Sequence, residues 1–187
     1  MPRANWFFGF PVDGAFVLQL PELPRSFRRF HAEDVHLTLA FLGGCGEEAA
    51  QRALVALDGA LATSPIKGVD ISLGDVVPMG ASRRRYSALS ALLERGRAEA
   101  TAHIVALRDV LTAAATGPRE LRPIKPHITL ARPRGGASSA DLSAGLTWAS
   151  VLDLRAVHAR LDRVALYTWS ESRRERLFQI VDERRLG

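Results

Sequence analysis

The chain contains a single cysteine and no long hydrophobic run. Cys45 alone excludes an intramolecular disulfide and a zinc site that needs several thiolates. No apolar stretch approaches the ~20 residues that a membrane-spanning helix needs. The apolar N-terminal stretch is interrupted by Asn5, Pro11 and Asp13, which is not typical of a signal peptide. We therefore expect a cytoplasmic protein with no membrane association.

Lysine is also scarce, and arginine carries the positive charge. Lys67 and Lys125 are the two lysines among 25 basic residues, which face 20 acidic ones for a net charge of +5. Arginine binds phosphate and stacks on bases, so this balance is compatible with a polyanionic partner. A chain rich in Ala, Arg and Gly is equally typical of a GC-rich genome, and composition alone favours that explanation. The remaining composition, 47% hydrophobic and 24% charged, is that of a globular protein.

Short turns, rather than linkers, separate the expected elements. Apolar residues at helical spacing predict helices over 47–63 and 97–115. Shorter helices are expected over 13–20, where Pro21 and Pro24 would end the helix, and over 139–146. Alternating or aromatic-rich runs predict strands over 5–10, 35–42, 69–77, 86–92, 127–131, 152–158, 164–169 and 176–181. The order of elements in the first half returns in the second. We therefore expect an α+β fold in one bilobal domain, residues 1–187. Each of its two pseudo-symmetric lobes has an antiparallel sheet with helices on its outer face.

Two of the expected strands carry the same motif. His36-Leu-Thr-Leu-Ala and His127-Ile-Thr-Leu-Ala both fit the pattern His-x-Thr-Leu-Ala. Side chains alternate between the faces of a strand, so His36 and Thr38 point the same way, as do His127 and Thr129. If the lobes are related by a pseudo-two-fold axis, two imidazoles and two hydroxyls converge on the cleft between them.

Paired imidazoles suit acid–base chemistry. One neutral ring can take a proton while a protonated ring gives one, and threonine hydroxyls can donate hydrogen bonds to a phosphoryl oxygen. Two other interpretations are a histidine that only satisfies a local hydrogen bond and a metal site. Neither motif has a carboxylate or cysteine at ligand spacing, so we expect no metal and no cofactor. The other histidines, His31, His103 and His158, have no such context and are expected to be structural or exposed.

Paired His-x-Thr motifs resemble those of the 2H phosphoesterases, and within them the RNA 2′,3′-cyclic phosphodiesterases, also called 2′-5′ RNA ligases. The similar segments are 6–10, 36–43, 125–132, 161–167 and 176–181. One departure is the opening strand, where the family's Phe-Phe-Ala reads Phe7-Phe8-Gly9. The resemblance implies metal-independent opening of a terminal 2′,3′-cyclic phosphate to a 2′-phosphomonoester, with 2′-5′ ligation as the reverse reaction.

The resemblance also implies roles for individual residues. His127 activates water and His36 protonates the departing 3′ oxygen, although a near-symmetric site also allows the opposite assignment. Thr38 and Thr129 bind the non-bridging oxygens, and Arg132 contacts the phosphate. Strict alternation sends Arg132 to the other face from Thr129, so this role requires the strand to end or twist before Pro133.

The expected partners are RNA ends or nucleotides that bear a 2′,3′-cyclic phosphate, bound by a monomer with no protein partner. Weaker candidates for contacts with RNA are basic or aromatic residues near the motifs and turns: Arg83, Arg84, Arg85, Arg122, Lys125, Phe7, Phe8 and Tyr86. Two alternatives remain. The chain could be a module that binds a phosphate end with little catalysis, or a 2H phosphodiesterase for another small cyclic nucleotide.

Overall fold

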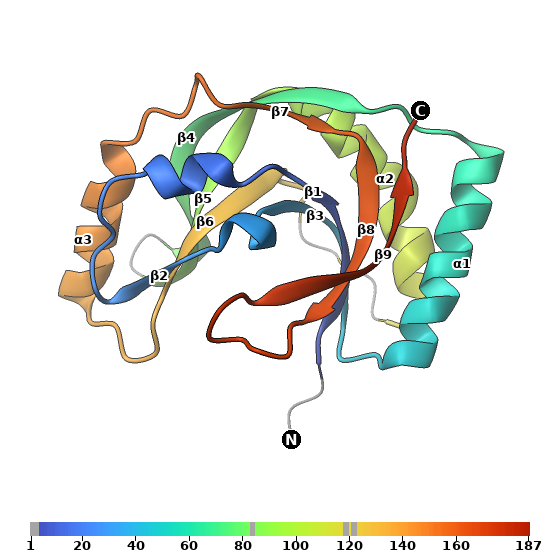
Figure 1. Ribbon diagram of the computed structural model, residues 1–187, viewed down its shortest axis with the longest axis horizontal. Helices are drawn as coiled ribbons and strands as arrows, with labels where there is room; N and C mark the ends of the chain where they lie inside the picture. Colours follow the sequence, from blue (N-terminus) through green and yellow to red (C-terminus); the bar gives the residue numbers. More distant parts are fainter. Residues whose placement is uncertain (1–3, 83–84, 118–119, 121–122) are drawn as a thin grey trace.

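The computed structural model describes residues 4–82, 85–117, 120 and 123–187 (Figure 1). The described residues form one antiparallel sheet of nine strands, three α-helices and two short 3-10 helices. The strands are β1 (Trp6–Pro11), β2 (Phe27–Arg29), β3 (His36–Gly43), β4 (Val69–Ser82), β5 (Arg85–Arg95), β6 (His127–Pro133), β7 (His158–Leu161), β8 (Arg163–Trp169) and β9 (Phe178–Arg185). The helices are α1 (Glu47–Thr63), α2 (Arg97–Ala114) and α3 (Ser139–Ser150), with η1 (Ala15–Gln19) and η2 (Ala32–Asp34) in the first loops. The expected α+β class is confirmed.

Most predicted elements lie where the sequence placed them, and two do not. The predicted helix over 13–20 is a 3-10 turn, in which Leu20 N–H donates to the carbonyl of Val17 just before Pro21. The predicted strand over 152–158 is wrong, since strand structure begins only at His158. The Asp153 carboxylate accepts the backbone N–H of Arg155 and folds this segment into turns. Strand β2 and the 3-10 helix η2 were not predicted from the sequence.

The strand order of the sheet is β7-β4-β5-β6-β3-β1-β8-β9, and β2 pairs with β6. Strands β3 and β6, which carry the two motifs, are therefore neighbours in the middle of the sheet. They are joined through one residue pair, Leu37 opposite Ile128. Strands from both halves of the sequence lie on each side of this pair, with β5, β4 and β7 beyond β6 and β1, β8 and β9 beyond β3.

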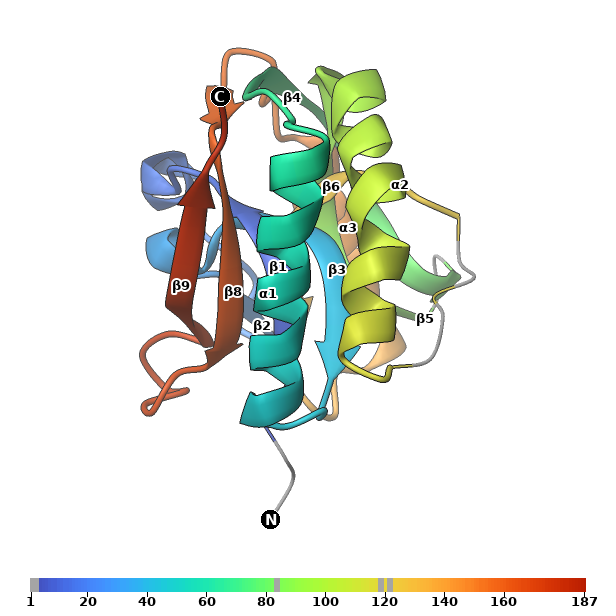
Figure 2. The ribbon, with the colours of Figure 1, turned by 90° about the vertical axis from the view of Figure 1, so that its right-hand side faces the viewer.

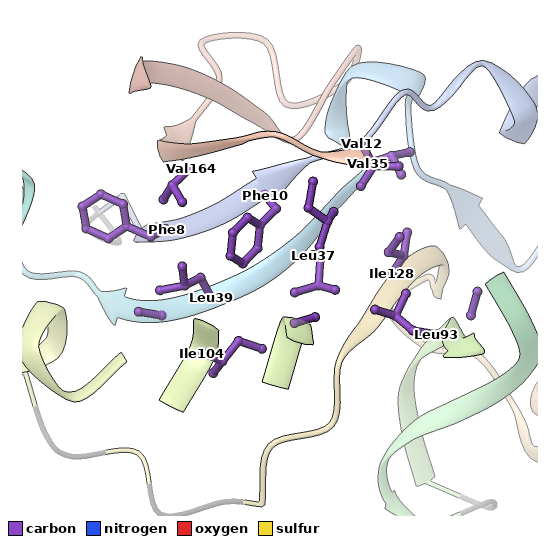
Figure 3. Packing of buried hydrophobic residues seen from close by; sticks show 14 of the residues in the cluster. Phe8, Phe10, Val12, Val35, Leu37, Leu39, Leu93, Ile104, Ile128 and Val164 are labelled. Carbon is purple, nitrogen blue, oxygen red and sulfur yellow. The ribbon is translucent and has the colours of Figure 1, made fainter. Parts of the chain in front are cut away.

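Helices α1 and α2 lie side by side over one face of the sheet, and α2 packs against β3 (Figure 2). Helix α3 lies apart from them, against β4 and β5 (Figure 1). The core between α2 and the sheet contains Phe8, Phe10, Leu37, Leu39 and Ile104, all nearly inaccessible to solvent (Figure 3). Burial of this layer fixes the position of β3 and, with it, the direction in which the opposite face points. None of the described helices is both long and apolar enough to cross a bilayer.

Two helix starts depend on local backbone chemistry. Gly96, before α2, has a φ of +74°, and a Cβ there would lie 2.5 Å from the carbonyl oxygen of Asp70. Only glycine fits this turn without displacing β4. Helix α3 begins with a capping box, in which Ser138 and Asp141 satisfy each other's backbone N–H groups.

Candidate active site

The two motifs meet around a local two-fold relation. Leu37 and Ile128 occupy the same position in the two motifs, and they lie opposite each other in an antiparallel pair. A two-fold axis through this pair relates His36 to His127 and places each histidine near the threonine of the other motif. Both paired side chains, Leu37 and Ile128, point into the core. The four polar side chains of the motifs therefore share the opposite face.

Each motif strand contains an irregularity at the leucine after its threonine. Against β3, Phe8 lies opposite Ala40 and Gly9 opposite Thr38, so Leu39 has no partner on β1. Against β6, Leu89 lies opposite Ala131 and Ser90 opposite Thr129, so Leu130 has no partner on β5. Such an extra residue is a β-bulge. The two bulges occupy the same motif position.

In both strands the bulge reverses the faces of the residues that come directly after it. Leu39 and Ala40 are both buried, as are Leu130 and Ala131. The next residue in each strand, Phe41 or Arg132, therefore returns to the side of the histidine and threonine. Strict alternation predicted the opposite face for Arg132. The bulge supplies the twist that its predicted role requires.

Both histidines are held by the same hydrogen bond. Nδ1 of His36 donates to the carbonyl oxygen of Asp34, and Nδ1 of His127 donates to that of Lys125, each at 2.6 Å. A carbonyl oxygen only accepts, so Nδ1 carries the proton in the neutral form of each ring. Nε2 of each ring is then left as the atom that can accept or donate a proton.

The surroundings of the two rings differ. His36 is 9% exposed and packs against three aromatic rings, with centroids 4.7 Å from Phe7, 5.2 Å from Tyr167 and 5.6 Å from Phe178. Burial in this aromatic cage lowers the pKa of His36 to about 4, against the opposing effect of the Asp34 hydrogen bond. The nearby positive charges of Arg132 and His127 lower this pKa further.

His127 lies in a more open position. The His127 ring is partly exposed, and no aromatic ring among the described residues packs against it. Partial burial still lowers its pKa, and the charges of Lys125 and Arg132 act in the same direction, against the Lys125 carbonyl hydrogen bond. In the free protein at neutral pH, both rings are therefore mainly uncharged.

Two adjoining cavities open on this face. The first, of about 220 Å³, contains His127, Thr38, Phe41 and Lys125 in its lining, with apolar walls from Met79, Ile104 and Ile124. The second, of about 260 Å³, is lined by Asn5, Phe7, His36, Thr38, Phe41, Arg132, Trp169, Arg173 and Phe178. Thr38 and Phe41 line both cavities, so they form the boundary between a cavity with His127 and a cavity with His36.

The predicted site residues have different positions relative to these cavities. His36, Thr38, His127 and Arg132 line one cavity or both. Thr129 lies outside both linings, and its hydroxyl is 3.2 Å from that of Ser90 on β5. Arg132 is exposed, and its guanidinium lies over the ring of Phe30 at 5.2 Å from the ring centroid. Partial loss of contact with water and the charge of Arg173 both lower the pKa of Arg132.

The weaker candidates separate more clearly. Phe7 and Lys125 line the cavities, whereas Phe8 is buried in the core. Tyr86 is buried against α3, where its hydroxyl donates to the carbonyl oxygen of Leu142 at 2.7 Å. Arg85 is exposed at the start of β5. Arg83, Arg84 and Arg122 lie outside the described residues. Among the other histidines, His31 caps η2, His103 bonds to the Lys67 carbonyl and His158 is exposed.

Several site residues were not predicted from the sequence. Phe41, which is 50% exposed, and Trp169 and Arg173 line the second cavity. Asp34, fully buried, accepts the backbone N–H groups of Leu177 and Phe178 at 2.7 and 2.9 Å. Asp34 thus ties the start of β9 to the segment whose carbonyl orients His36. The one sequence signal that could have found any of them is an aromatic residue, Phe41, directly after the His-x-Thr-Leu-Ala motif.

No group of three or more His, Cys, Asp or Glu side chains that could hold a metal occurs within the described part of the chain. Cys45 lies outside both cavities, and burial raises the pKa of its thiol.

The fold matches solved structures along almost its whole length. E. coli LigT complexed with 3′-AMP is 19% identical, with a TM-score of 0.70, and the match covers 100% of this chain and 99% of that chain. A phosphoesterase of known structure is 19% identical, with a TM-score of 0.69 and 98% of each chain covered. The protein TT0787 of Thermus thermophilus is 17% identical, with a TM-score of 0.66 and 97% of each chain covered.

Sequence comparisons give no corresponding match. No protein-family model matches the chain, and neither does any curated protein. The structural matches alone confirm, at the level of the fold, the resemblance that the two motifs indicated. The chain has the LigT-like α+β fold.

Proposed function

We propose that this chain is a metal-independent 2H phosphodiesterase that opens a 2′,3′-cyclic phosphate on RNA or a nucleotide to a 2′-phosphomonoester. The observation that carries the proposal is the duplicated histidine arrangement. Two imidazoles, each held at Nδ1 by the carbonyl two residues earlier, are related by the local two-fold at Leu37 and Ile128. The LigT-like fold supports it. The site needs no cofactor for this reaction, and we propose that a monomer carries it out in the cytoplasm.

The chemistry requires one ring to act as base and the other as acid. A cyclic phosphate bound between His36 and His127 places negative charge beside both rings, which raises their lowered pKa values again. One ring takes a proton from water through Nε2, and the water oxygen attacks phosphorus. The bond from phosphorus to the 3′ oxygen breaks, and the other ring protonates that oxygen. The family resemblance makes His127 the base and His36 the acid.

Charge that develops on the phosphoryl oxygens is met by donors on the same face. Thr38 lies between the two cavities, where its hydroxyl can donate to a non-bridging oxygen. Arg132 brings a positive guanidinium to the second cavity, at a position that the Leu130 bulge turns toward the site. We assign the matching role of the second threonine to Thr129, whose hydroxyl is shared with Ser90.

The nucleoside part of the substrate has an aromatic cavity available. Phe41 and Trp169 are the aromatic residues of the second cavity that retain exposed surface, and bases stack on such side chains. E. coli LigT has been crystallised with 3′-AMP, ATP, NADP+ and phosphate. By likeness to that structure, we propose that nucleotides enter this chain's cavities too.

The direct test is turnover in the presence of a chelator. Cytidine 2′,3′-cyclic phosphate and a short RNA with a 2′,3′-cyclic phosphate end are incubated with the protein, and the product is identified by chromatography. We expect a 2′-phosphate, without loss of rate on adding the chelator. Absence of turnover on both substrates would contradict the proposal. If the substrates still bound, the alternative of a binding module for phosphate ends would replace it.

A second arm of the assay addresses the other alternative. A panel of small cyclic nucleotides outside the 2′,3′-cyclic class would be assayed at the same enzyme concentration. Turnover restricted to one of these would assign the chain to a different 2H substrate while leaving the paired-histidine chemistry intact.

A further inference from the structure

We propose that Arg28 and Arg173, which both lie near Arg132, form a subsite for a second phosphate of the substrate. This inference rests on the proposed function and refines it: the preferred substrate is an oligonucleotide end, whose neighbouring phosphodiester binds beside the reacting phosphate. A mononucleotide 2′,3′-cyclic phosphate lacks that group.

Two arginines face each other across strands β2 and β6. Arg28 on β2 lies directly opposite Arg132 on β6. Residues that face each other in an antiparallel pair project from the same side of the sheet, and like charges in that position repel. A bound anion relieves this repulsion, so the pair is better suited to the complex than to the free protein.

The turn between β8 and β9 brings another arginine, Arg173, near Arg132. Arg28 Nη2 donates to the carbonyl oxygen of Arg174 at 3.2 Å, and so joins β2 to this turn. The preceding residue, Arg173, lines the second cavity together with Arg132. Its positive charge is close enough to lower the pKa of Arg132.

Two of these guanidinium groups are held in advance of binding. Arg173 stacks over Trp169, 4.2 Å from the ring centroid, and Arg132 lies over Phe30. Stacking covers one face of a guanidinium and leaves its N–H edge free to donate to phosphate oxygens. Side chains that are already ordered lose less conformational entropy on binding.

The acidic side chains of the described residues do not pair with this group, since none of their ion pairs involves Arg28, Arg132 or Arg173. The two glutamates of the turn, Glu171 and Glu175, line a separate hollow with Arg176 and Gln179. The positive charge beside the second cavity is therefore available to a ligand.

The test compares four substrates that share one terminal nucleoside with a 2′,3′-cyclic phosphate: the mononucleotide, the mononucleotide with a 5′-phosphate, the dinucleotide, and the dinucleotide with an uncharged methylphosphonate linkage. We expect kcat/KM for the dinucleotide to exceed that for the mononucleotide by roughly 10-fold or more, since a hydrogen bond to a charged group contributes about 1.5–3 kcal/mol. The methylphosphonate should remove most of this preference. A 5′-phosphate that is as effective as the dinucleotide would make a phosphorylated nucleotide the substrate and overturn the assignment to an oligonucleotide.

The variants Arg28→Gln and Arg173→Gln should lower the ratio of dinucleotide to mononucleotide rates roughly 10-fold, and reduce the salt dependence of dinucleotide binding by about 0.7 in logarithmic slope per lost contact. Arg52→Gln, an equal change in charge at an exposed position on α1, is the matched control and should leave the ratio unchanged. Equal losses on both substrates, or no preference in the unmodified protein, would overturn the proposal.

Failure of the subsite can be separated from failure of the proposed function. A fluorescent dinucleotide with a 3′-phosphate reports binding without turnover, and its methylphosphonate analogue reports the contribution of the linkage charge. The protein could turn over neither cyclic phosphate and still bind the charged dinucleotide more tightly than its methylphosphonate analogue. If Arg173→Gln then removes this difference in affinity, the subsite stands and the hydrolase proposal fails.

Discussion

Strands β3 and β6 have the same motif, the same bulge and the same histidine hydrogen bond, yet they give their histidines different surroundings. His36 is enclosed by the rings of Phe7, Tyr167 and Phe178, whereas His127 is partly open to solvent beside Lys125. The backbone repeats, and the packing does not. Two imidazoles in equivalent backbone positions can therefore have different proton affinities, because the neighbouring strands β1, β8 and β9 cover His36 and not His127.

The largest expected effect comes from removing either imidazole. His36→Asn and His127→Asn should each lower kcat/KM for a 2′,3′-cyclic nucleotide roughly 10²–10⁴-fold, since each removes one proton-transfer partner. His158→Asn, at an exposed position on β7, should retain full activity. Near-full rates in both His36 and His127 variants would rule out the mechanism, provided that their unfolding midpoints show a folded protein.

A substrate with sulfur in place of the 3′ bridging oxygen then distinguishes the two roles. A thiolate leaves without protonation, because its pKa lies far below that of an alcohol. The variant that lacks the acid should regain most of its rate on this substrate, and the variant that lacks the base should not. Rescue of His127→Asn instead of His36→Asn would reverse the assignment that the family resemblance gives.

The next comparison is thermodynamic and does not depend on activity. The unfolded-state pKa of histidine is about 6.5, and that of His36 in the folded protein is about 4. Between these values the unfolded state binds a proton that the folded state does not, so the stability contributed by His36 falls as the pH is lowered from 6.5 to 4. The full difference amounts to about 3 kcal/mol. His127, with more solvent around it, should contribute less.

Urea unfolding at pH 7 and pH 5 measures this difference. The free energy of unfolding should decrease less between pH 7 and pH 5 in His36→Gln than in the unmodified protein, whatever the effect of the substitution at pH 7. His127→Gln should reduce this decrease by a smaller amount. Carboxylates titrate in the same range, so the comparison is between each variant and the unmodified protein. An equal change for the two histidines would mean that the aromatic cage does not separate them.

The two residues after the bulges allow a third comparison. Arg132 and Phe41 occupy equivalent positions on β6 and β3, and one offers charge where the other offers an aromatic face. Arg132→Gln should lower kcat/KM roughly 10- to 100-fold, because a charged hydrogen bond to phosphate contributes about 1.5–3 kcal/mol. Arg132→Lys should recover only part of this loss, since lysine lacks the planar fork.

Phe41→Leu should act mainly on KM, by roughly 5- to 10-fold, since base stacking contributes about 1–3 kcal/mol and leucine retains part of that apolar contact. An abasic cyclic phosphate sugar should show no such difference. Equal effects of Phe41→Leu on the complete and abasic substrates would mean that Phe41 shapes the site without touching a base.

These residues also show how far sequence reasoning reaches. The helix over 47–63 was predicted with its observed bounds, because apolar spacing is a local property that packing against the sheet preserves. The shared face of His36 and Thr38 followed from strand alternation. The bulges at Leu39 and Leu130 did not, because a bulge is defined by register against a neighbouring strand. The position of Phe41 and the orientation of Arg132 both depend on those bulges.

Contacts between segments far apart in the chain could not be predicted from the sequence for a related reason. The aromatic cage of His36 and the bonds from Asp34 to Leu177 and Phe178 join the first forty residues to the last strands. Nothing in local composition marks these pairs. The predicted division into two pseudo-symmetric lobes remains a prediction, for which the local two-fold at Leu37 and Ile128 is the best support.

The smallest expected effect tests how tightly the covered histidine is held. Gly9 lies opposite Thr38, and a Cβ there would sit 3.3 Å from Cδ2 of His36 and 3.0 Å from the carbonyl oxygen of Leu37. Gly9→Ala should therefore displace the His36 ring by a few tenths of an ångström and lower kcat/KM a few-fold. The matched control is Gly59→Ala on α1, where a Cβ meets no atom within 4 Å. It should leave activity unchanged and stabilise the helix by up to ~1 kcal/mol.

The family that the two motifs resemble often has alanine at the position of Gly9, which makes the outcome informative in both directions. A reduced rate with unchanged KM, and a shifted imidazole signal for His36 alone in NMR spectra, would show that this chain has closed its aromatic cage around His36 more tightly than an alanine allows. An unchanged rate and spectrum would show that the space beside the His36 ring accommodates a methyl group. The difference between the two histidines would then rest on solvent exclusion alone, with no contribution from the close approach of β1.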